Sequence, residues 1–438
     1  MRENRSIWIG YITGYRGGGA RIQRAALTLE QEKRAARPDC VIRCHPVETK
    51  RAFVEALARI RTNNEVISEF HLLGHSALYG FMFNTCELPE QFSPHEWRQL
   101  EIPFAPDGEA YLHGCRTARW FAPFFARTFG VPASGYHWFT TFSTSRSRFR
   151  WEGPLRSRQA PLYVVGCPGR KSHGVIASIA KYSGFLSVER FKRMEPRPID
   201  GDPTYDSIAP LYDAAYSNIR VRSDEWAWIS RHLPRAGPRV LDVGCGNGAL
   251  LLELKDQLAR GVGVDISRPL VTIAQDKAKG LSHLEFQVIE GPSLPLPDQG
   301  FDAIISLLSF RYLDWDPMMN ELRRVLAPGG RMLIVDVVTA PVAIHEIPTA
   351  VRSKIRHVVQ QRRFPGFAHA QRTLTRDPRW ANMLKYNPIR LERELRLYLQ
   401  SRFPEGRLEV LSIEGQHRTL AFDTGPLQPG WVAPQSYP

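Results

Sequence analysis

The chain has 438 residues, of which 43% are apolar, and it carries a formal net charge of +14. This length suits two or three domains with substantial hydrophobic cores. No run approaches the ~18–20 consecutive apolar residues of a membrane-spanning helix. The N-terminus lacks the apolar segment and cleavage site of a secretory signal peptide. The six cysteines form no Cys-x-x-Cys pair, so we expect a cytoplasmic protein without a metal site.

The positive charge is unevenly distributed along the chain. Residues 1–200 contain 29 Lys and Arg against 18 Asp and Glu, a net charge of +11, which leaves +3 for the remainder. A basic half can indicate binding to nucleic acid or to another anionic partner. The arginines are spread rather than clustered, however, which favours a compositional bias. Nucleic acid is therefore kept as the less favoured alternative.

Strand-like and helix-like segments alternate through the N-terminal half, which predicts an α/β domain. Short apolar runs predict strands over residues 7–12, 40–44, 69–76 and 109–118. Helical spacing of apolar residues predicts helices over residues 20–36, 51–60 and 120–129.

Two of these predicted strands end in residues that carry chemistry. One run ends in Gly74-His75, and a later one ends in Gly114-Cys115. The carboxyl ends of neighbouring parallel strands can face one crevice. There an imidazole can take the proton of a thiol and leave the reactive thiolate.

This arrangement resembles the caspase-like fold, including its bacterial CHAT-type members. The resemblance implies that His75 is the base and Cys115 the nucleophile. Ser76 stands where the family usually has glycine, and the Gln-Ala-Cys-x-Gly signature is absent. Two other interpretations stay open: a domain of this fold that only binds, and an unrelated α/β domain with an incidental buried cysteine.

A segment rich in proline, glycine and charge follows the N-terminal half. It reads Met-Glu-Pro-Arg-Pro-Ile-Asp-Gly-Asp-Pro over residues 194–203 and shows no apolar periodicity. We therefore predict a first domain over residues 1–195, a linker over 196–203, and a second domain over 204–438.

The most informative stretch of the sequence lies in the second domain. An apolar run ends at Asp242 and leads into the glycine turn Gly244-Cys-Gly246-Asn-Gly248, which an apolar helical segment follows. A strand, a glycine turn and a helix bring the backbone close to a nucleotide-like ligand. A second short strand ends at Asp265, where a carboxylate can accept both ribose hydroxyls.

These motifs resemble the class I S-adenosylmethionine (SAM) methyltransferases, in particular the ubiquinone/menaquinone group. Further matches are LPLPDQGFDAIIS and ELRRVLAPGGRMLIVD, so the resemblance is good over residues 203–340. It implies a Rossmann-like, seven-stranded fold that binds SAM and releases S-adenosylhomocysteine.

The resemblance also implies the residues that bind the cofactor. Backbone of the glycine turn should line the methionine part, Asp242 should hold its amino group, and Asp265 should bind the ribose. The full set is Tyr212, Asp242, Gly244, Cys245, Gly246, Asp265, Ile266, Glu290, Gly291, Ser306 and Leu307. Arg311 and Tyr312, which follow the fourth strand, are candidate contacts of the methyl acceptor.

An insertion rich in arginine and aromatic residues covers about residues 340–402. In this family such an insertion caps the active site. The expected function is methyl transfer to an unidentified acceptor, a small molecule or biosynthetic intermediate, with the N-terminal domain binding, docking or processing. The alternatives are a bifunctional Cys-His peptidase and methyltransferase acting on a peptide or protein, and a nucleic-acid methyltransferase.

Overall fold

The computed structural model describes residues 4–84, 89–151, 160–169 and 175–428. The chain forms two compact units, Met1–Pro198 and Ile199–Ser436, with each of the two large sheets inside one unit. Among the described residues, no helix is long and apolar enough to cross a membrane.

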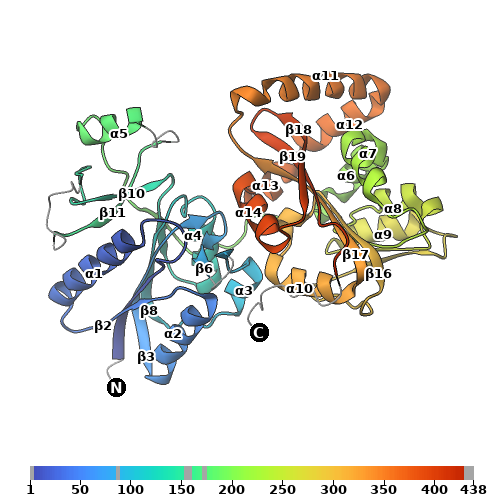
Figure 1. The fold of residues 1–438 in the computed structure, drawn as a ribbon. Helices are drawn as coiled ribbons and strands as arrows, with labels where there is room; N and C mark the ends of the chain where they lie inside the picture. Colours follow the sequence, from blue (N-terminus) through green and yellow to red (C-terminus); the bar gives the residue numbers. More distant parts are fainter. Residues whose placement is uncertain (1–3, 85–88, 152–159, 170–174, 429–438) are drawn as a thin grey trace. The chain divides into compact units, whose positions relative to one another are not determined.

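A six-stranded sheet forms the centre of the N-terminal unit (Figure 1). Its order is β2 (Val41–Pro46), β1 (Asn4–Tyr11), β3 (Glu65–Leu73), β8 (Phe104–His113), β9 (Ala133–Gly135) and β12 (Lys192–Met194). The first five strands are parallel and β12 runs antiparallel to β9. Consecutive strands therefore end at the same edge, which is where parallel α/β sheets bind ligands.

The side chains of this sheet alternate between two cores. Trp8 of β1 packs with Phe53 and Phe70 in one buried cluster, whereas Ile7 and Ile9 pack with Ile22 in another. This follows from the two-residue period of a strand, whose successive side chains point to opposite faces. The helices are α1 (Gly19–Ala36), α2 (Lys50–Thr62), α3 (Pro94–Gln99), α4 (Phe121–Phe129) and α5 (Val175–Tyr182).

Short strands complete the N-terminal unit. They pair as β4 (Ser76–Ala77) with β5 (Gly80–Phe81), β6 (Phe83–Asn84) with β7 (Pro89–Glu90), and β10 (Thr140–Ser143) with β11 (Tyr163–Gly166). All three pairs are antiparallel.

The C-terminal unit is built on a seven-stranded mixed sheet. Its order is β15 (Leu284–Val288), β14 (Arg260–Asp265), β13 (Arg239–Val243), β16 (Phe301–Leu307), β17 (Leu326–Thr339), β19 (His417–Asp423) and β18 (Arg407–Glu414). The first five strands are parallel, and β19 and β18 are antiparallel to their neighbours. The chain reverses its strand order between β13 and β16, and such a switch point is a ligand crevice.

Helices cover both faces of this sheet, and each face has its own buried core. Trp228 and Leu251 are buried in one core, and Met318 and Leu399 in the other. The helices are α6 (Ala209–Tyr216), α7 (Ser223–His232), α8 (Ala249–Leu254), α9 (Arg268–Lys277) and α10 (Trp315–Val325). Short 3-10 turns are η1 (Asp206–Ile208), η2 (Ile219–Val221), η3 (Lys255–Gln257), η4 (Phe310–Tyr312) and η5 (Ile344–Glu346).

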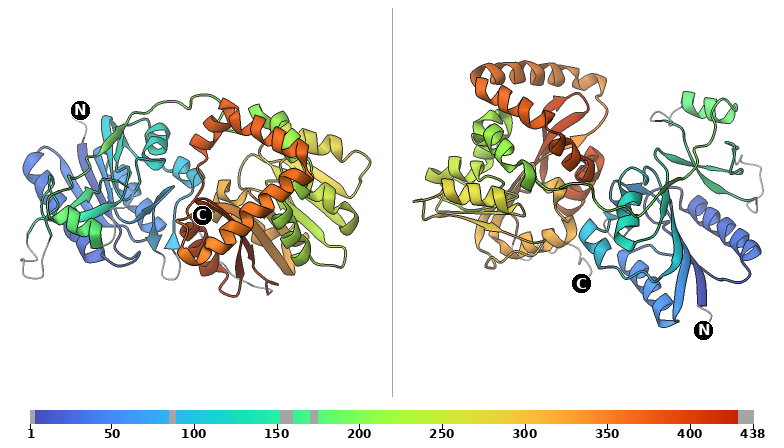
Figure 2. Two further views of the ribbon diagram at one scale, coloured as in Figure 1. Left: turned by 90° about the horizontal axis from the view of Figure 1, so that it is seen from above. Right: turned by 180° about the vertical axis from the view of Figure 1, so that it is seen from behind.

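The predicted insertion is a helical cap between β17 and β18. It consists of α11 (Ile347–Arg363), α12 (Pro365–Arg376), α13 (Pro378–Tyr386) and α14 (Glu392–Arg402). In Figure 1 and in the right view of Figure 2, α11 and α12 lie at the upper edge of the C-terminal unit. The lead-in helix α6 packs against α12, so the cap and the start of the unit meet.

Candidate active site

The glycine turn follows β13 directly, at the switch point of the sheet. Asp242 is the last but one residue of this strand and is only 1% exposed. Its Oδ1 atom has no hydrogen-bond partner among the described residues. Burial raises the pKa of its carboxyl to about 8, and the nearby Asp265 adds to the shift. An unpartnered buried acceptor of this kind suits a ligand that brings a positive charge.

The glycines of this turn are required by backbone conformation and by close neighbours. Gly244 and Gly246 have φ values of +77° and +53°, which L-residues with a side chain rarely adopt. A Cβ on Gly244 would lie 2.3 Å from Cβ of Ser309. A Cβ on Gly246 would lie 3.6 Å from the ring of Tyr212, which is an ordinary contact distance.

Asp265 ends the neighbouring strand β14 and is tied to the glycine turn. Its Oδ2 accepts a hydrogen bond from the N–H of Gly246 at 2.8 Å, and its Oδ1 accepts one from the N–H of Ser267 at 2.9 Å. Burial raises the pKa of this carboxyl, and these N–H groups oppose the rise. The next residue, Ile266, is 64% exposed and offers an apolar face to a flat ring.

Two further predicted positions adjoin this pair of strands. The N–H of Ile289 donates to the carbonyl of Asp265 at 3.0 Å, which puts Glu290 and Gly291 at the end of β14. A Cβ on Gly291 would meet open space. Glu290 is exposed.

The end of β16 lies beneath the glycine turn. The hydroxyls of Ser306 and Ser309 are 2.8 Å apart, and Ser309 donates to the carbonyl of Val243 at 2.6 Å. Leu307 is half-buried, and Leu308 has a φ of +58°, a strained value for a branched side chain. Strain at the carboxyl end of a central strand is typical of a functional turn.

Tyrosines of the lead-in segment cover this end of the sheet. Tyr212 lies on α6 against Gly246, and its ring is 5.4 Å from that of Tyr205. The hydroxyl of Tyr205 is 3.0 Å from that of Tyr312. Tyr312, predicted as an acceptor contact, is thus part of this aromatic group.

Arg311, the other predicted acceptor contact, lies in a buried ion pair. Its guanidinium contacts the carboxylate of Asp336, which is fully buried, and its own N–H donates to the same carboxylate at 2.5 Å. One guanidinium nitrogen also donates to the hydroxyl of Tyr312 at 2.8 Å. Arg311 therefore holds the turn after β16 against β17 and orients Tyr312.

A cavity of about 170 Å³ lies beneath the cap, and sequence reasoning missed its polar residues. It is lined by residues of α6, α7, the cap, β18 and β19 and by the turn before α7, among them Tyr216, Arg222, Glu225, His357 and Arg418. Burial raises the pKa of the Glu225 carboxyl. Arg222 stacks on the ring of Tyr216 at 4.0 Å. The sequence carries no signal for this cavity, because its residues are far apart in the chain.

The residues at the switch point fit SAM. The buried acceptor of Asp242 suits the ammonium group, and the positive φ of Gly244 and Gly246 gives the turn a backbone conformation that favours glycine. Cys245 is buried, and burial raises the pKa of its thiol well above the usual value. A thiol in this state is inert and packs as a small apolar group.

Comparison with known proteins points to the same class. Residues 241–334 match the family model described as a methyltransferase domain. Demethylmenaquinone methyltransferase of Thermus thermophilus is 35% identical over 145 residues, which cover 31% of this chain and 66% of that protein. The tRNA (carboxymethyluridine(34)-5-O)-methyltransferase of Arabidopsis thaliana is 27% identical over 217 residues, 48% of each chain.

Among solved structures, a SAM dependent methyltransferase from Aquifex aeolicus is similar with a TM-score of 0.33 and 19% identity, covering 51% of this chain and 100% of that one. The chain spans only 42–66% of the length of four demethylmenaquinone methyltransferases that it matches.

These matches support a class I SAM-dependent methyltransferase domain in the C-terminal unit. They also support SAM as its cofactor. The residues matched by the family model all lie in the C-terminal unit.

The N-terminal unit holds His75 and Cys115 just beyond the ends of the paired strands β3 and β8. Nε2 of His75 is 3.1 Å from the carbonyl of Gly17, so this nitrogen carries the proton and Nδ1 is the free acceptor. The thiol of Cys115 accepts a hydrogen bond from the N–H of Thr140 at 3.3 Å and lies 3.2 Å from its hydroxyl. Within the described residues, no hydrogen bond joins His75 to Cys115.

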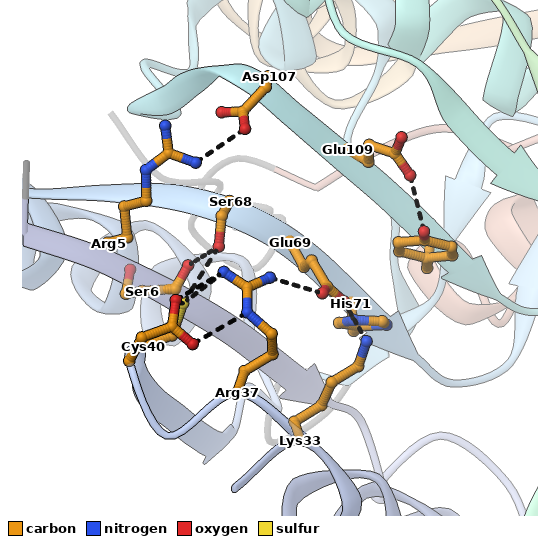
Figure 3. Close-up of polar contacts among 12 residues, drawn as sticks. Arg5, Ser6, Lys33, Arg37, Cys40, Ser68, Glu69, His71, Asp107 and Glu109 are labelled. Carbon is orange, nitrogen blue, oxygen red and sulfur yellow. Dashed lines mark hydrogen bonds and ion pairs between the residues drawn. The ribbon is translucent and has the colours of Figure 1, made fainter. Parts of the chain in front are cut away.

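A chain of polar side chains on β3 and β8 runs along one face of the same sheet. Glu69 forms ion pairs with Lys33 and Arg37, and Nε2 of His71 donates to it at 3.0 Å (Figure 3). Burial alone would raise the pKa of Glu69, but the hydrogen bonds from His71 and Lys33 outweigh it and lower the pKa to about 2. Nδ1 of His71 then accepts from Nε2 of His113 at 3.1 Å.

These contacts determine which ring nitrogen of His113 carries the proton. Its Nε2 carries the proton, so its Nδ1 is a hydrogen-bond acceptor without a partner among the described residues. Burial lowers the pKa of His113 well below its usual value, which keeps the ring neutral. His113 lines a cavity of about 660 Å³ between α1, β11 and the residues before β12. Tyr136, Arg146 and Glu189 line the same cavity.

Proposed function

We propose that this protein transfers a methyl group from SAM to a small-molecule acceptor. The observation that carries the proposal is the buried, unpartnered Oδ1 of Asp242 beneath a glycine turn that Asp265 fixes from the next strand. The menaquinone-type relatives support an aromatic, apolar acceptor.

Residues at the ends of β13 and β14 would bind different parts of SAM. Asp242 would hold the amino group of the methionine part, and Asp265 would accept from the ribose hydroxyls. Ile266 would pack on the adenine, with Glu290 and Gly291 beside its edge. SAM supplies a methyl group that is already activated as part of a sulfonium. The protein has mainly to align the acceptor and exclude water, and positioning alone can contribute ~7–11 kcal/mol.

We propose that the acceptor enters beneath the cap. The cavity of about 170 Å³ is reached from α6, whose Tyr212 lies on Gly246 and whose Tyr216 lines the cavity. Glu225 has the raised pKa expected of a group that takes a proton from an acceptor hydroxyl. Tyr205 and Tyr312 would exclude water from the methyl group.

Calorimetric titration with SAM tests the cofactor site. We expect Asp242→Ala and Asp265→Ala to weaken SAM binding by about 10- to 100-fold, because each removes a charge-assisted hydrogen bond. Asp256→Ala removes an exposed carboxylate of the same unit and serves as the matched control with unchanged affinity. Equal affinities for all four proteins would contradict the assignment.

For the N-terminal unit we propose a caspase-like domain over residues 1–195 that binds a ligand or partner, joined by residues 196–203 to the methyltransferase domain over residues 204–438. Support comes from the positions of His75 and Cys115 at neighbouring strand ends and from the cavity at His113. A peptidase activity is the second candidate, favoured by the N–H and the hydroxyl of Thr140, which both lie against the Cys115 thiol. Failure of thiol-reactive peptide probes to label Cys115 would remove that candidate.

A further inference from the structure

The cap helix α11 carries an apolar face that the described part of the chain does not cover. The six side chains of this α11 face, all 43–87% exposed, are Ile344, Ile347, Val351, Ile355, Val358 and Val359. From Ile347 onward they recur every three or four residues and therefore share one side of the helix. Figure 1 and the right view of Figure 2 show α11 at the upper edge of the C-terminal unit.

The opposite side of α11 faces the protein and is polar. The Ser353 hydroxyl accepts from the N–H of Ile413 at 3.1 Å, and Nδ1 of His357 lies 3.7 Å from the carboxylate of Glu414. Arg356 pairs with Asp224 at 3.1 Å. A surface helix normally turns its apolar side inward. In α11 the polar side faces the protein and the apolar side faces outward. An exposed apolar face of this kind marks a surface that contacts a partner or a membrane.

The positive charge of α11 indicates which kind of partner covers this face. The helix contains five Lys and Arg residues and no Asp or Glu. Arg352, Lys354, Arg362 and Arg363 are exposed and have no ion-pair partner within the described residues. A second copy packed on the α11 face would bring like charges together. Anionic lipid headgroups would neutralise these cations while the acyl region takes up the aliphatic side chains.

We propose that α11 lies in the surface of an anionic membrane with the α11 face inserted. The helix would dock with its axis along the membrane plane, as amphipathic helices with basic flanks do. If the proposed function holds, an apolar acceptor dissolved in the lipid would reach the cap directly. Vesicle binding itself does not require methyl transfer, so the two can be tested separately.

Sedimentation of the full chain with vesicles tests the docking. We expect binding to phosphatidylcholine vesicles that contain phosphatidylglycerol, and much weaker binding to phosphatidylcholine alone or at high salt. The triple variant Val351→Gln, Ile355→Gln, Val359→Gln should bind about tenfold more weakly or worse, since it removes the inserted side chains. All three positions are exposed and glutamine favours helix, so the fold should be retained.

Two control variants make the test specific. Leu27→Gln with Val54→Gln replaces exposed aliphatic side chains of α1 and α2 and should bind vesicles like the wild type. Substitution of Val175, Ile176 and Ile179, the exposed side chains of α5, should also leave binding intact. Loss of binding only in the α5 variant, or no binding of the wild type, would overturn the proposal.

Two further measurements separate membrane docking from dimerisation and from damage to the cofactor site. Light scattering should show the same mass for the wild type and the α11 triple variant, whereas a dimer lost on substitution would make the α11 face a protein interface and overturn the proposal. SAM affinity should be equal in both proteins. If the wild type failed to bind SAM, the proposed function would fail while the vesicle result would stand.

Discussion

At the scale of single residues, the candidate site depends on one carboxyl that is poorly stabilised by the protein alone. Asp242 is buried, one of its oxygens has no partner among the described residues, and its pKa is about 8. Asp265, in contrast, is held by the N–H groups of Gly246 and Ser267. A cationic ligand beside Asp242 would favour the ionised carboxylate, so the group would give up its proton and gain a charge-assisted hydrogen bond when the ligand binds.

This carboxyl should make stability depend on pH. Between about pH 4 and pH 8 the folded protein keeps a proton on Asp242 that the unfolded chain has lost. The free energy of unfolding should therefore fall as the pH rises through this window and level off above it. Asp242→Asn removes this titration.

Urea unfolding without SAM, at about pH 5 and about pH 8, measures the effect. We expect the Asn variant to be more stable than the wild type at the higher pH, with a smaller difference at the lower pH. Parallel pH curves for the two proteins would contradict the raised pKa.

Residues whose role follows from local sequence could be predicted, and those whose role depends on distant contacts could not. Asp242 is the last but one residue of β13 and Asp265 the last residue of β14, and the motif fixes both positions. Arg311 also lies at a predicted place, but its partner Asp336 is 25 residues away on another strand. No pattern in the sequence links His71 to His113, which meet only because β3 and β8 pair in register.

At the scale of the elements, the turn after β16 is held by a buried ion pair in addition to the apolar packing of Phe310. Arg311 and Asp336 are 11% and 0% exposed at the side chain. Arg311→Met should lower the free energy of unfolding by about 3–5 kcal/mol, because Asp336 would be left as a buried, unpaired charge. Chemical denaturation measures this loss.

The control for this prediction is a more exposed pair in the same unit. Arg239 and Asp302 are 42% and 40% exposed, so Arg239→Met should cost about 1 kcal/mol or less. The double variant Arg311→Met, Asp336→Leu should recover part of the loss, since no charge is then left unpaired. Equal costs at the two arginines would contradict a structural role for the buried pair.

At this scale the sequence was also informative where periodicity is strong. The helix expected over residues 20–36 is α1, and the seven-stranded sheet and the cap between β17 and β18 agree with the family resemblance. The reversed polarity of α11 was not predicted, because arginine and aromatic residues in a cap suggest a contact with the acceptor. Only the structure shows that Ser353, Arg356 and His357 face inward.

At the scale of the whole molecule, a short exposed segment separates the two units. Residues 195–201 are all exposed. The end of this segment is tied to the cap, since the N–H of Asp200 donates to the Tyr386 hydroxyl at 3.0 Å and Asn382 donates to the Asp200 carbonyl at 2.8 Å. The polar composition of this segment is the feature from which the sequence predicts a linker.

Limited proteolysis tests whether the units fold separately. Thermolysin cleaves before aliphatic residues, and Ile199 is 46% exposed. We expect early cleavage at this position into two fragments that each keep a cooperative thermal transition. A segment that resists cleavage until both units unfold would contradict the division.

The most direct test of methyl transfer uses SAM labelled on its methyl group. The purified protein and extract of its source cells would be incubated with this SAM, and the products separated into apolar small molecules, protein and nucleic acid. We predict that the label enters an apolar small molecule and that Asp265→Ala abolishes the transfer. Label in RNA would contradict the proposed acceptor class, and equal labelling by wild type and variant would contradict the site itself.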